Sequence, residues 1–141
     1  MNNEQPIIVD TNILFSALLR TESHFAVTLL HSERTFYICE FVLVELFKYK
    51  ERIVQASRLS EDDVLRMYHV FLRRINLYKE DLISPDNRSM AYNLCHDIDP
   101  KDSLQVALTL EINGLLWTGD KKLRTGLTRK GFTHFYDLHT V

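Results

Sequence analysis

The sequence predicts an α/β protein whose parallel β-sheet is covered by helices on both faces. Two observations support this fold class. Short apolar segments rich in β-branched residues alternate along the chain with longer segments of helical periodicity, as they do in parallel sheets. The first such segment, residues 6–10, contains Ile7, Ile8 and Val9 in succession, a pattern typical of a buried strand. A chain of 141 residues with 45% apolar residues can bury one core, so residues 1–141 are expected to form one domain.

The other elements follow from apolar spacing and from turn residues. Strands are expected at residues 6–10, 35–39, 76–79, 115–118 and 133–136. Helices are expected at residues 12–19, 25–30, 41–52, 87–95 and 102–112. Asn113 and Gly114 would end the last of these helices. Ser60 and Asp63 form a capping-box pattern that predicts one more helix. The apolar face of that helix would carry Val64, Tyr68, Phe71 and Ile75.

Composition narrows the range of functions. The net charge of −2 argues against a protein that coats nucleic acid, but not against an enzyme with a local basic path. Cys39 and Cys95 lie far apart and form no paired zinc motif, so both are expected to be small apolar residues in a reducing cytosol. No apolar run approaches the ~20 residues of a membrane span, and residues 1–6 lack the layout of a signal peptide. We therefore expect a cytoplasmic protein that does not enter a membrane.

Two acidic residues directly follow expected strands. Asp10 ends the first strand, and Asp120 follows the strand at 115–118. Ligands of open parallel sheets bind beyond the carboxyl ends of the strands, so both carboxylates stand where a site would form. Each could instead cap a turn or a helix. Gly119, just before Asp120, permits an unusual backbone angle or the close approach of another group.

Glu45 is a third candidate because apolar residues surround it along residues 41–47. A carboxylate in that setting is expected to be at least partly buried and to need a partner. Lys48 or Tyr49, one turn along the same helix, would be the ordinary partner. A metal ion is the alternative that we favour.

A fourth acid comes from a cluster in which Asp97, Asp99 and Asp102 fall within six positions. Such a cluster indicates either a solvated loop or a bound cation, and Asp102 could also complement the dipole of the helix it begins. Together with the other three acids, it places one carboxylate on each of four elements. Oxygen ligands of this kind suit Mg²⁺ or Mn²⁺ better than zinc. The six histidines form no recognisable nucleophile motif, so a metal would have to supply the nucleophile.

Four segments of the chain resemble those of the PIN-domain nucleases, a family that includes the VapC-type toxins of bacterial toxin–antitoxin pairs. They occur in the family's order at residues 8–14, 42–46, 102–107 and 118–120, and so span nearly the whole chain. The first and last segments are the most specific. The resemblance favours Asp102 as the third acid, because residues 103–107 continue the family's helix, and leaves Asp99 as the second choice.

The resemblance implies a PIN-like three-layer α/β/α sandwich whose first and fourth strands lie side by side in a central parallel sheet. Asp10 and Asp120 would then face the same crevice. It further implies endoribonuclease activity that depends on Mg²⁺ or Mn²⁺, often in a homodimer, with an antitoxin protein as a partner. The catalytic and metal-binding residues that it implies are Asp10, Glu45, Asp102 and Asp120, with Asp99 as an additional candidate ligand.

Neighbouring polar residues are expected to support such a site. Asn12 and Thr118 would hold carboxylates or water in place. Lys121, Lys122 and Arg124 directly follow Asp120 and are the best candidates for phosphate contacts, although ordinary solvated surface is the alternative.

Other functions remain to be weighed against this one. The main alternative is a non-catalytic PIN-like module that binds RNA or a protein partner, and the presence of all four acids argues against it. A phosphatase of the haloacid-dehalogenase type would need a second acid where Asn12 stands. A receiver domain would need a strand-end aspartate near position 55, where this chain is expected to be helical.

Overall fold

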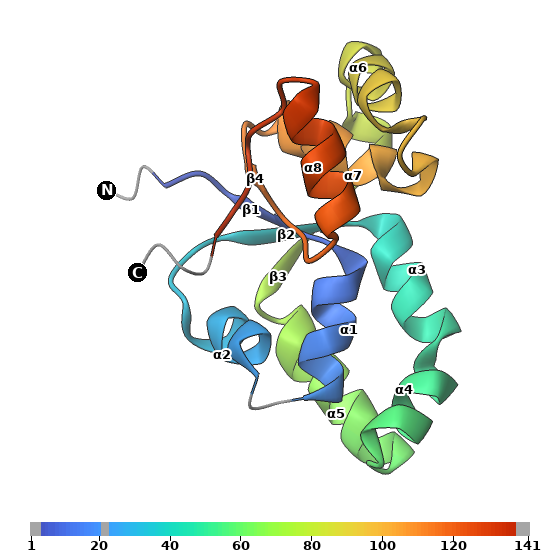
Figure 1. The fold of residues 1–141 in the computed structure, drawn as a ribbon. Helices are drawn as coiled ribbons and strands as arrows, with labels where there is room; N and C mark the ends of the chain where they lie inside the picture. The colour runs from blue at the N-terminus through green and yellow to red at the C-terminus, as the bar shows by residue number, and fades with distance from the viewer. Residues whose placement is uncertain (1–3, 21–22, 138–141) are drawn as a thin grey trace.

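A computed structural model describes residues 4–20 and 23–137 of the chain. Its centre is a four-stranded sheet in the order β3-β2-β1-β4, and every pair of neighbouring strands is parallel (Figure 1). The strands are β1 (Ile7–Val9), β2 (Phe36–Cys39), β3 (Ile75–Tyr78) and β4 (Leu115–Trp117). The parallel α/β fold that the sequence predicts is confirmed.

Helices cover the sheet on both faces, as Figure 1 shows. One layer contains α6 (Pro85–Cys95), α7 (Ser103–Glu111) and α8 (Lys121–Arg129), with α7 in contact with β1, β2 and β4. The other layer is built around α1 (Thr11–Leu19), which contacts α2 (His24–His31), α3 (Glu40–Lys48), α4 (Lys50–Ser57) and α5 (Glu61–Leu72). Two short 3₁₀ helices, η1 (Glu80–Leu82) and η2 (Pro100–Asp102), precede α6 and α7.

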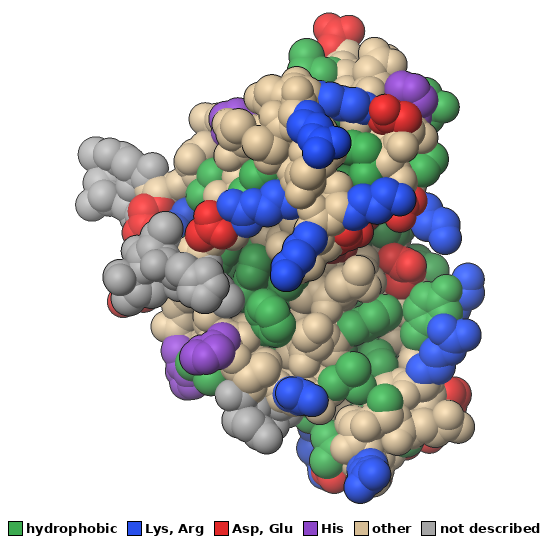
Figure 2. Space-filling model, viewed as in Figure 1, with side chains coloured by type: hydrophobic (Ala, Val, Ile, Leu, Met, Phe, Trp, Pro, Cys, Tyr) green, Lys and Arg blue, Asp and Glu red, His purple; other side chains and the backbone are tan. Residues whose placement is uncertain are grey.

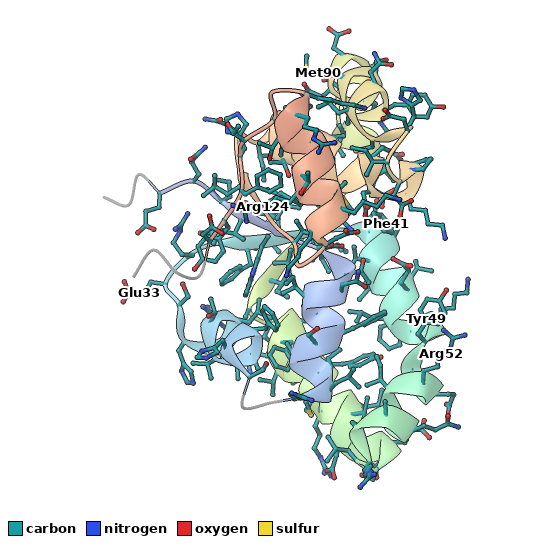
Figure 3. The ribbon with its side chains drawn as sticks, in the orientation of Figure 1. Glu33, Phe41, Tyr49, Arg52, Met90 and Arg124 are labelled. Atoms are coloured by element: carbon teal, nitrogen blue, oxygen red, sulfur yellow. The ribbon has the colours of Figure 1, made fainter. Side chains whose placement is uncertain are left out.

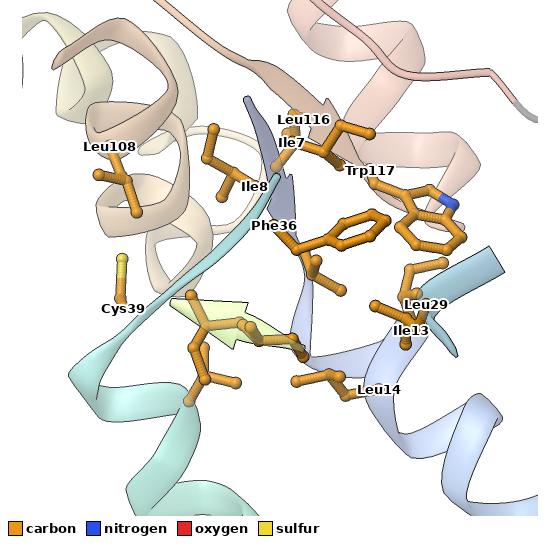
Figure 4. Packing of buried hydrophobic residues seen from close by; sticks show 14 of the residues in the cluster. Ile7, Ile8, Ile13, Leu14, Leu29, Phe36, Cys39, Leu108, Leu116 and Trp117 are labelled. Atoms are coloured by element: carbon orange, nitrogen blue, oxygen red, sulfur yellow. The ribbon is translucent and has the colours of Figure 1, made fainter. Parts of the chain in front are cut away.

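The core lies on both sides of β1. Ile7, Ile8 and Val9 are fully buried, which explains why this strand contains no polar residue. Figure 4 shows Phe36 beside Trp117 on one side of the sheet and Leu108 of α7 on the other. The rings of Phe36 and Trp117 lie 5.9 Å apart between centroids. Both cysteines are buried free thiols, as expected, and burial raises the pKa of each to about 12.

Three expected elements differ from those in the structure. The helix expected at 41–52 is two helices, because the chain bends at Tyr49 and so brings α4 against α1 and α5. Ile75 is buried as expected but begins β3 rather than extending α5. Residues 133–136 form a single bridge, Leu116 to Phe135, instead of a strand, because the N–H of Phe135 bonds locally to the Thr133 carbonyl at 3.0 Å. The predicted cap of α5 is confirmed, since the Ser60 hydroxyl accepts the Asp63 N–H at 3.1 Å.

No single helix among the described residues is both long and apolar enough to cross a membrane. Within the described part of the chain, one pair of helices, α1 and α2, reaches that length and composition when taken together, and their axes differ in direction by 103°.

Candidate active site

The pairing of β1 with β4 brings together the two acids that follow these strands. Val9 pairs with Trp117, and the N–H of Asp10 donates to the Trp117 carbonyl at 3.0 Å. The Thr118 hydroxyl then donates to Oδ2 of Asp10 at 2.7 Å and accepts the N–H of Asp120 at 3.1 Å. Thr118 therefore links the two acids, and the expected adjacency of the first and fourth strands is confirmed.

Asp120 also begins α8. Its side chain accepts the N–H of Leu123 at 3.1 Å through Oδ1, so the capping role that the sequence allowed is present. Oδ2 accepts no hydrogen bond from the described residues, which leaves it available to another ligand. Capping and ligand binding are thus compatible in this residue.

Glu45 is half-buried on α3, and neither Lys48 nor Tyr49 is its partner. Instead, the Thr11 hydroxyl donates to Oε1 of Glu45 at 3.2 Å. Thr11 in turn accepts a long hydrogen bond from Nε2 of Gln105, on α7, at 3.4 Å. This relay connects α7, α1 and α3 and fixes one oxygen of Glu45, while its Oε2 has no partner among the described residues.

The acids meet at a pocket of about 450 Å³. Two of the three acids in the cluster line it, Asp99 and Asp102, whereas Asp97 faces away and pairs with Lys130. Asp120 does not line the pocket itself but adjoins it through Thr118. The residues that line it are Asp10, Thr11, Asn12, Phe15, Phe41, Glu45, Tyr49, Asp99, Lys101, Asp102, Leu104 and Gln105.

Two aromatic residues border this pocket, one at the start of α3 and one at the bend that follows it (Figure 3). Phe41 stands at the start of α3, and its N–H donates to Oε1 of Glu80 at 2.6 Å. Tyr49 stands at the bend after α3 and meets Phe15 edge to face, with 6.1 Å between ring centroids. The bend that the sequence did not predict therefore forms one wall of the pocket.

Burial, and to a smaller extent mutual repulsion, disfavours the charged forms of two of these acids. Burial raises the pKa of Asp102 to about 7, with further contributions from the charges of Asp10, Asp99, Asp120 and Glu45. Burial also raises the pKa of Asp10, against the opposing effect of hydrogen bonds from Thr118 and Gln105. No ion pair between described residues involves Asp10, Glu45, Asp102 or Asp120. No described Lys or Arg therefore forms an ion pair with these four acids, although Lys101 lines the same pocket.

The donor set fits a hard divalent cation. Carboxylate oxygens without protein partners are available on Glu45 and Asp120, and Oε1 of Gln105 is buried without a hydrogen-bond partner. Mg²⁺ and Mn²⁺ prefer such oxygen ligands. As they are placed, no three Asp, Glu, His or Cys side chains within residues 4–20 and 23–137 converge closely enough to surround one ion, so binding would require the carboxylates to draw together.

The raised pKa of Asp102 predicts a pH dependence of stability. A carboxyl whose pKa is higher in the folded state stabilises the fold while protonated, and this stabilisation is lost as pH rises from about 4 through about 7. We expect the metal-free protein to unfold at lower urea concentration at pH 8 than at pH 5. Asp102→Asn should flatten this dependence, as measured by urea unfolding in EDTA, and an equally steep pH dependence in both proteins would contradict the prediction.

Several residues that line the pocket were not predicted from the sequence. Thr11 stands next to Asp10, and Gln105 lies one turn beyond Asp102, so both positions could have been found by asking what shares a face or a turn with each acid. Lys101 is the one Lys or Arg among the described residues that line the pocket. Asn12 lines it too, but its backbone, rather than its side chain, supplies the hydrogen bond that lowers the pKa of Asp10.

The predicted phosphate contacts divide into two kinds. Lys121 and Lys122 are exposed on the first turn of α8. Arg124, labelled in Figure 3, donates from both terminal nitrogens to the Asp137 carboxylate at 2.9 Å and lies 4.8 Å from the centroid of the Phe135 ring. A phosphate would have to compete with Asp137 for Arg124. Figure 2 shows acidic side chains in a hollow beside the start of α8, with Lys and Arg side chains around it.

A sequence model of the PIN domain matches residues 8–135, which is most of the chain and includes the acids of the pocket and Asp120. The chain belongs to the PIN-domain family. This assignment confirms the resemblance inferred from residues 8–14 and 118–120. None of the curated protein sequences compared with the chain matched it significantly.

Two solved structures illustrate the PIN-like fold. The crystal structure of PAE2754 from Pyrobaculum aerophilum is similar at a TM-score of 0.61 and 14% identity, over 86% of this chain and 79% of that one. The crystal structure of VapBC2 from Rickettsia felis, bound to a DNA fragment from its promoter, is similar at a TM-score of 0.57 and 20% identity, over 84% of this chain and 91% of that one. At these identities the likeness shows a shared fold, and the three-layer arrangement of this PIN domain agrees with it.

Proposed function

We propose that this PIN domain is a metal-dependent endoribonuclease that hydrolyses phosphodiester bonds of RNA at the acidic pocket. The observation that carries the proposal is the gathering of Asp10, Glu45, Asp99 and Asp102 at one pocket with Asp120 beside it. Burial and the charges of the neighbouring carboxylates raise the pKa of Asp102 there, and none of these acids forms an ion pair within the described part of the chain. A fold that keeps several carboxylates at one pocket at a cost in stability is typical of a functional site. Membership in the PIN-domain family supports a nuclease.

Asp10, Glu45, Asp102 and Asp120 are the proposed ligands of Mg²⁺ or Mn²⁺, with Asp99 as an additional candidate. Such an ion, when bound, polarises a phosphate and makes water a better nucleophile near neutral pH. The chain's own contribution is orientation. Thr118 holds Asp10, Thr11 holds Glu45, and the Leu123 N–H holds Asp120, each through one carboxylate oxygen.

Lys121, Lys122 and Arg124 are the proposed contacts for RNA phosphates near the acids. Lys121 and Lys122 are exposed beside Asp120, and Lys101 lines the pocket itself. Cations at the rim of an acidic pocket would draw the RNA backbone toward carboxylates that would otherwise repel it.

We also propose that the protein is the toxin of a toxin–antitoxin pair, that it binds an antitoxin protein and that it forms a homodimer. The fold likeness to a chain of the VapBC2 structure supports an antitoxin partner. Co-expression with the product of an adjacent gene, followed by co-purification and a cleavage assay, would test whether such a partner binds and inhibits.

RNA cleavage by the purified protein tests the proposed activity. Wild-type protein should cut labelled RNA internally in the presence of Mg²⁺ or Mn²⁺ and leave it intact in EDTA. Asp120→Asn should lose this activity while keeping the α8 cap, because the side-chain oxygen of asparagine can still accept the Leu123 N–H. Asp62→Asn, at an exposed acid of α5, is the matched control and should cleave like wild type.

Equal background degradation by wild type, Asp120→Asn and the control would falsify the nuclease proposal. RNA binding without cleavage by the wild-type protein would favour the non-catalytic module instead. An electrophoretic binding assay on the same samples separates these two outcomes.

A further inference from the structure

A second hollow lies along α8, outside the acidic pocket, with a volume of about 500 Å³. We call it the α8 cradle. Lys and Arg side chains lie along this part of the surface in Figure 2. The residues that line the cradle are Asp97, Ile98, Lys121, Lys122, Thr125, Gly126, Arg129 and Lys130.

The cradle carries a net positive charge that no acid offsets. Asp97 is the one acid among the described residues that line it, and it is paired with Lys130, which also donates to the Leu94 carbonyl at 2.9 Å. The other three cations, Lys121, Lys122 and Arg129, have no acidic partner in the described part of the chain. Three unpaired cations in one hollow favour an anionic ligand with more than one charge.

The helix presents these cations on a firmly held surface. Leu123 and Leu127 are fully buried on the inner face of α8 and anchor it to the core. Gly126 allows Ile98 to approach closely, because a Cβ at position 126 would lie 2.5 Å from Cδ1 of Ile98. The floor of the cradle is therefore fixed by direct contact between α8 and residue 98, and the cations stand above it.

The length of the cradle fits several phosphates in a row. From Lys121 to Arg129 the helix rises by ~12 Å. At ~3.4 Å of axial rise per phosphate for one strand of a helical nucleic acid, this length corresponds to roughly three phosphates. One end of this row is Lys121, the residue after Asp120, so a strand engaged at the acids would continue along α8.

We propose that the α8 cradle binds the sugar–phosphate backbone of RNA next to the site of cleavage. The inference rests on the proposed function for the choice of RNA, and it adds Arg129 and a requirement for an RNA long enough to span α8. Because the contacts are to phosphates, the cradle contributes affinity but no sequence preference.

The test is the salt dependence of RNA binding, measured in an Asp10→Asn background so that the RNA stays intact. In this background we replace the three unpaired cations, giving the cradle variant Lys121→Ala/Lys122→Ala/Arg129→Ala. The cradle variant should bind a single-stranded RNA of about 20 nucleotides at least ~10-fold more weakly than Asp10→Asn alone at ~0.1 M salt. It should also reduce the slope of log K against log salt by about 2, at ~0.7 for each lost phosphate contact.

Two matched variants make the result specific. The control variant Arg66→Ala/Arg73→Ala/Lys79→Ala removes the same charge from three exposed cations, which lie in α5, directly after α5 and directly after β3. It should leave the slope unchanged. The charge-preserving Lys121→Arg/Lys122→Arg/Arg129→Lys should keep the wild-type slope. The cradle proposal is overturned if the control variant shows the same reduction in the salt slope as the cradle variant, or if the cradle variant keeps the wild-type slope.

Different results would contradict the cradle proposal and the proposed nuclease function. Binding is measured without cleavage. If the wild-type protein does not cleave RNA, the nuclease proposal is overturned, and the salt slopes still test whether the cradle binds RNA. Conversely, a wild-type slope in the cradle variant would overturn the cradle while cleavage by the wild-type protein continued to support the nuclease.

Discussion

Asp10→Asn is expected to reduce RNA cleavage by more than ~100-fold, because residues that merely orient metal ligands already contribute 10–100-fold and Asp10 is proposed as a ligand itself. The substitution removes the charge and one of the two acceptor oxygens, on which the hydrogen bonds from Gln105 and the backbone of Thr11 and Asn12 also draw. Asparagine has nearly the same shape, and the Thr118 hydroxyl can still donate to its side-chain oxygen. The fold around the junction of β1 and β4 should therefore persist.

The same variant should be more stable than wild type in the absence of metal. Asp10 is 3% exposed, and burial raises its pKa, so its charged form is disfavoured in the folded protein. Removing that charge should raise the urea midpoint in EDTA at pH 8. The control is again Asp62→Asn, which should change neither cleavage nor the midpoint. Loss of activity together with a lower midpoint would indicate that Asp10 is mainly structural and would contradict its proposed role.

Gly114→Ala is expected to cause the largest loss of stability among the glycine substitutions. A Cβ at this position would lie 2.4 Å from Cδ1 of Ile8 and 2.7 Å from the carbonyl oxygen of Pro6. That carbonyl accepts the N–H of Leu115 at 2.8 Å at the start of β4, so the backbone has little room to move. We expect a loss of ~2–3 kcal/mol in the free energy of unfolding.

Because Gly114 controls how β4 meets β1, its substitution should also weaken cleavage by loosening the link from Asp10 through Thr118 to Asp120. Gly119→Ala is the matched control, since a Cβ there would meet nothing closer than Cδ1 of Ile13 at 3.9 Å. Its unfolding free energy should stay within ~0.5 kcal/mol of wild type. Similar destabilisation by both substitutions, measured by urea unfolding, would contradict this account.

The outcome for Gly119 reverses an expectation from the sequence. The residue before Asp120 suggested an unusual backbone angle or a close approach of another group. In the structure Gly119 has no positive φ, and the space around it admits a methyl group. Of the two glycines that flank β4, the one that permits close approach is Gly114, at the start of the strand, where the distant residues Pro6 and Ile8 come close.

The sequence by itself determined the parallel α/β class and the acids at strand ends. These are local properties. An uninterrupted apolar run such as Ile7–Val9 has to be buried on both faces, and the residue after such a strand has to emerge at its carboxyl end. The partial burial of Glu45 could also be predicted locally, because its neighbours along the chain are apolar.

Only the tertiary structure decided which side chains meet. Asp97 and Asp99 are two residues apart, yet one pairs with Lys130 in the α8 cradle and the other lines the acidic pocket. Arg124 pairs with Asp137, thirteen residues away, and Thr11, rather than the nearby Lys48, partners Glu45. These contacts depend on how α7, α8 and α3 pack around one sheet. Local spacing specifies the face of each element, but it does not specify which faces from distant parts of the chain lie opposite each other.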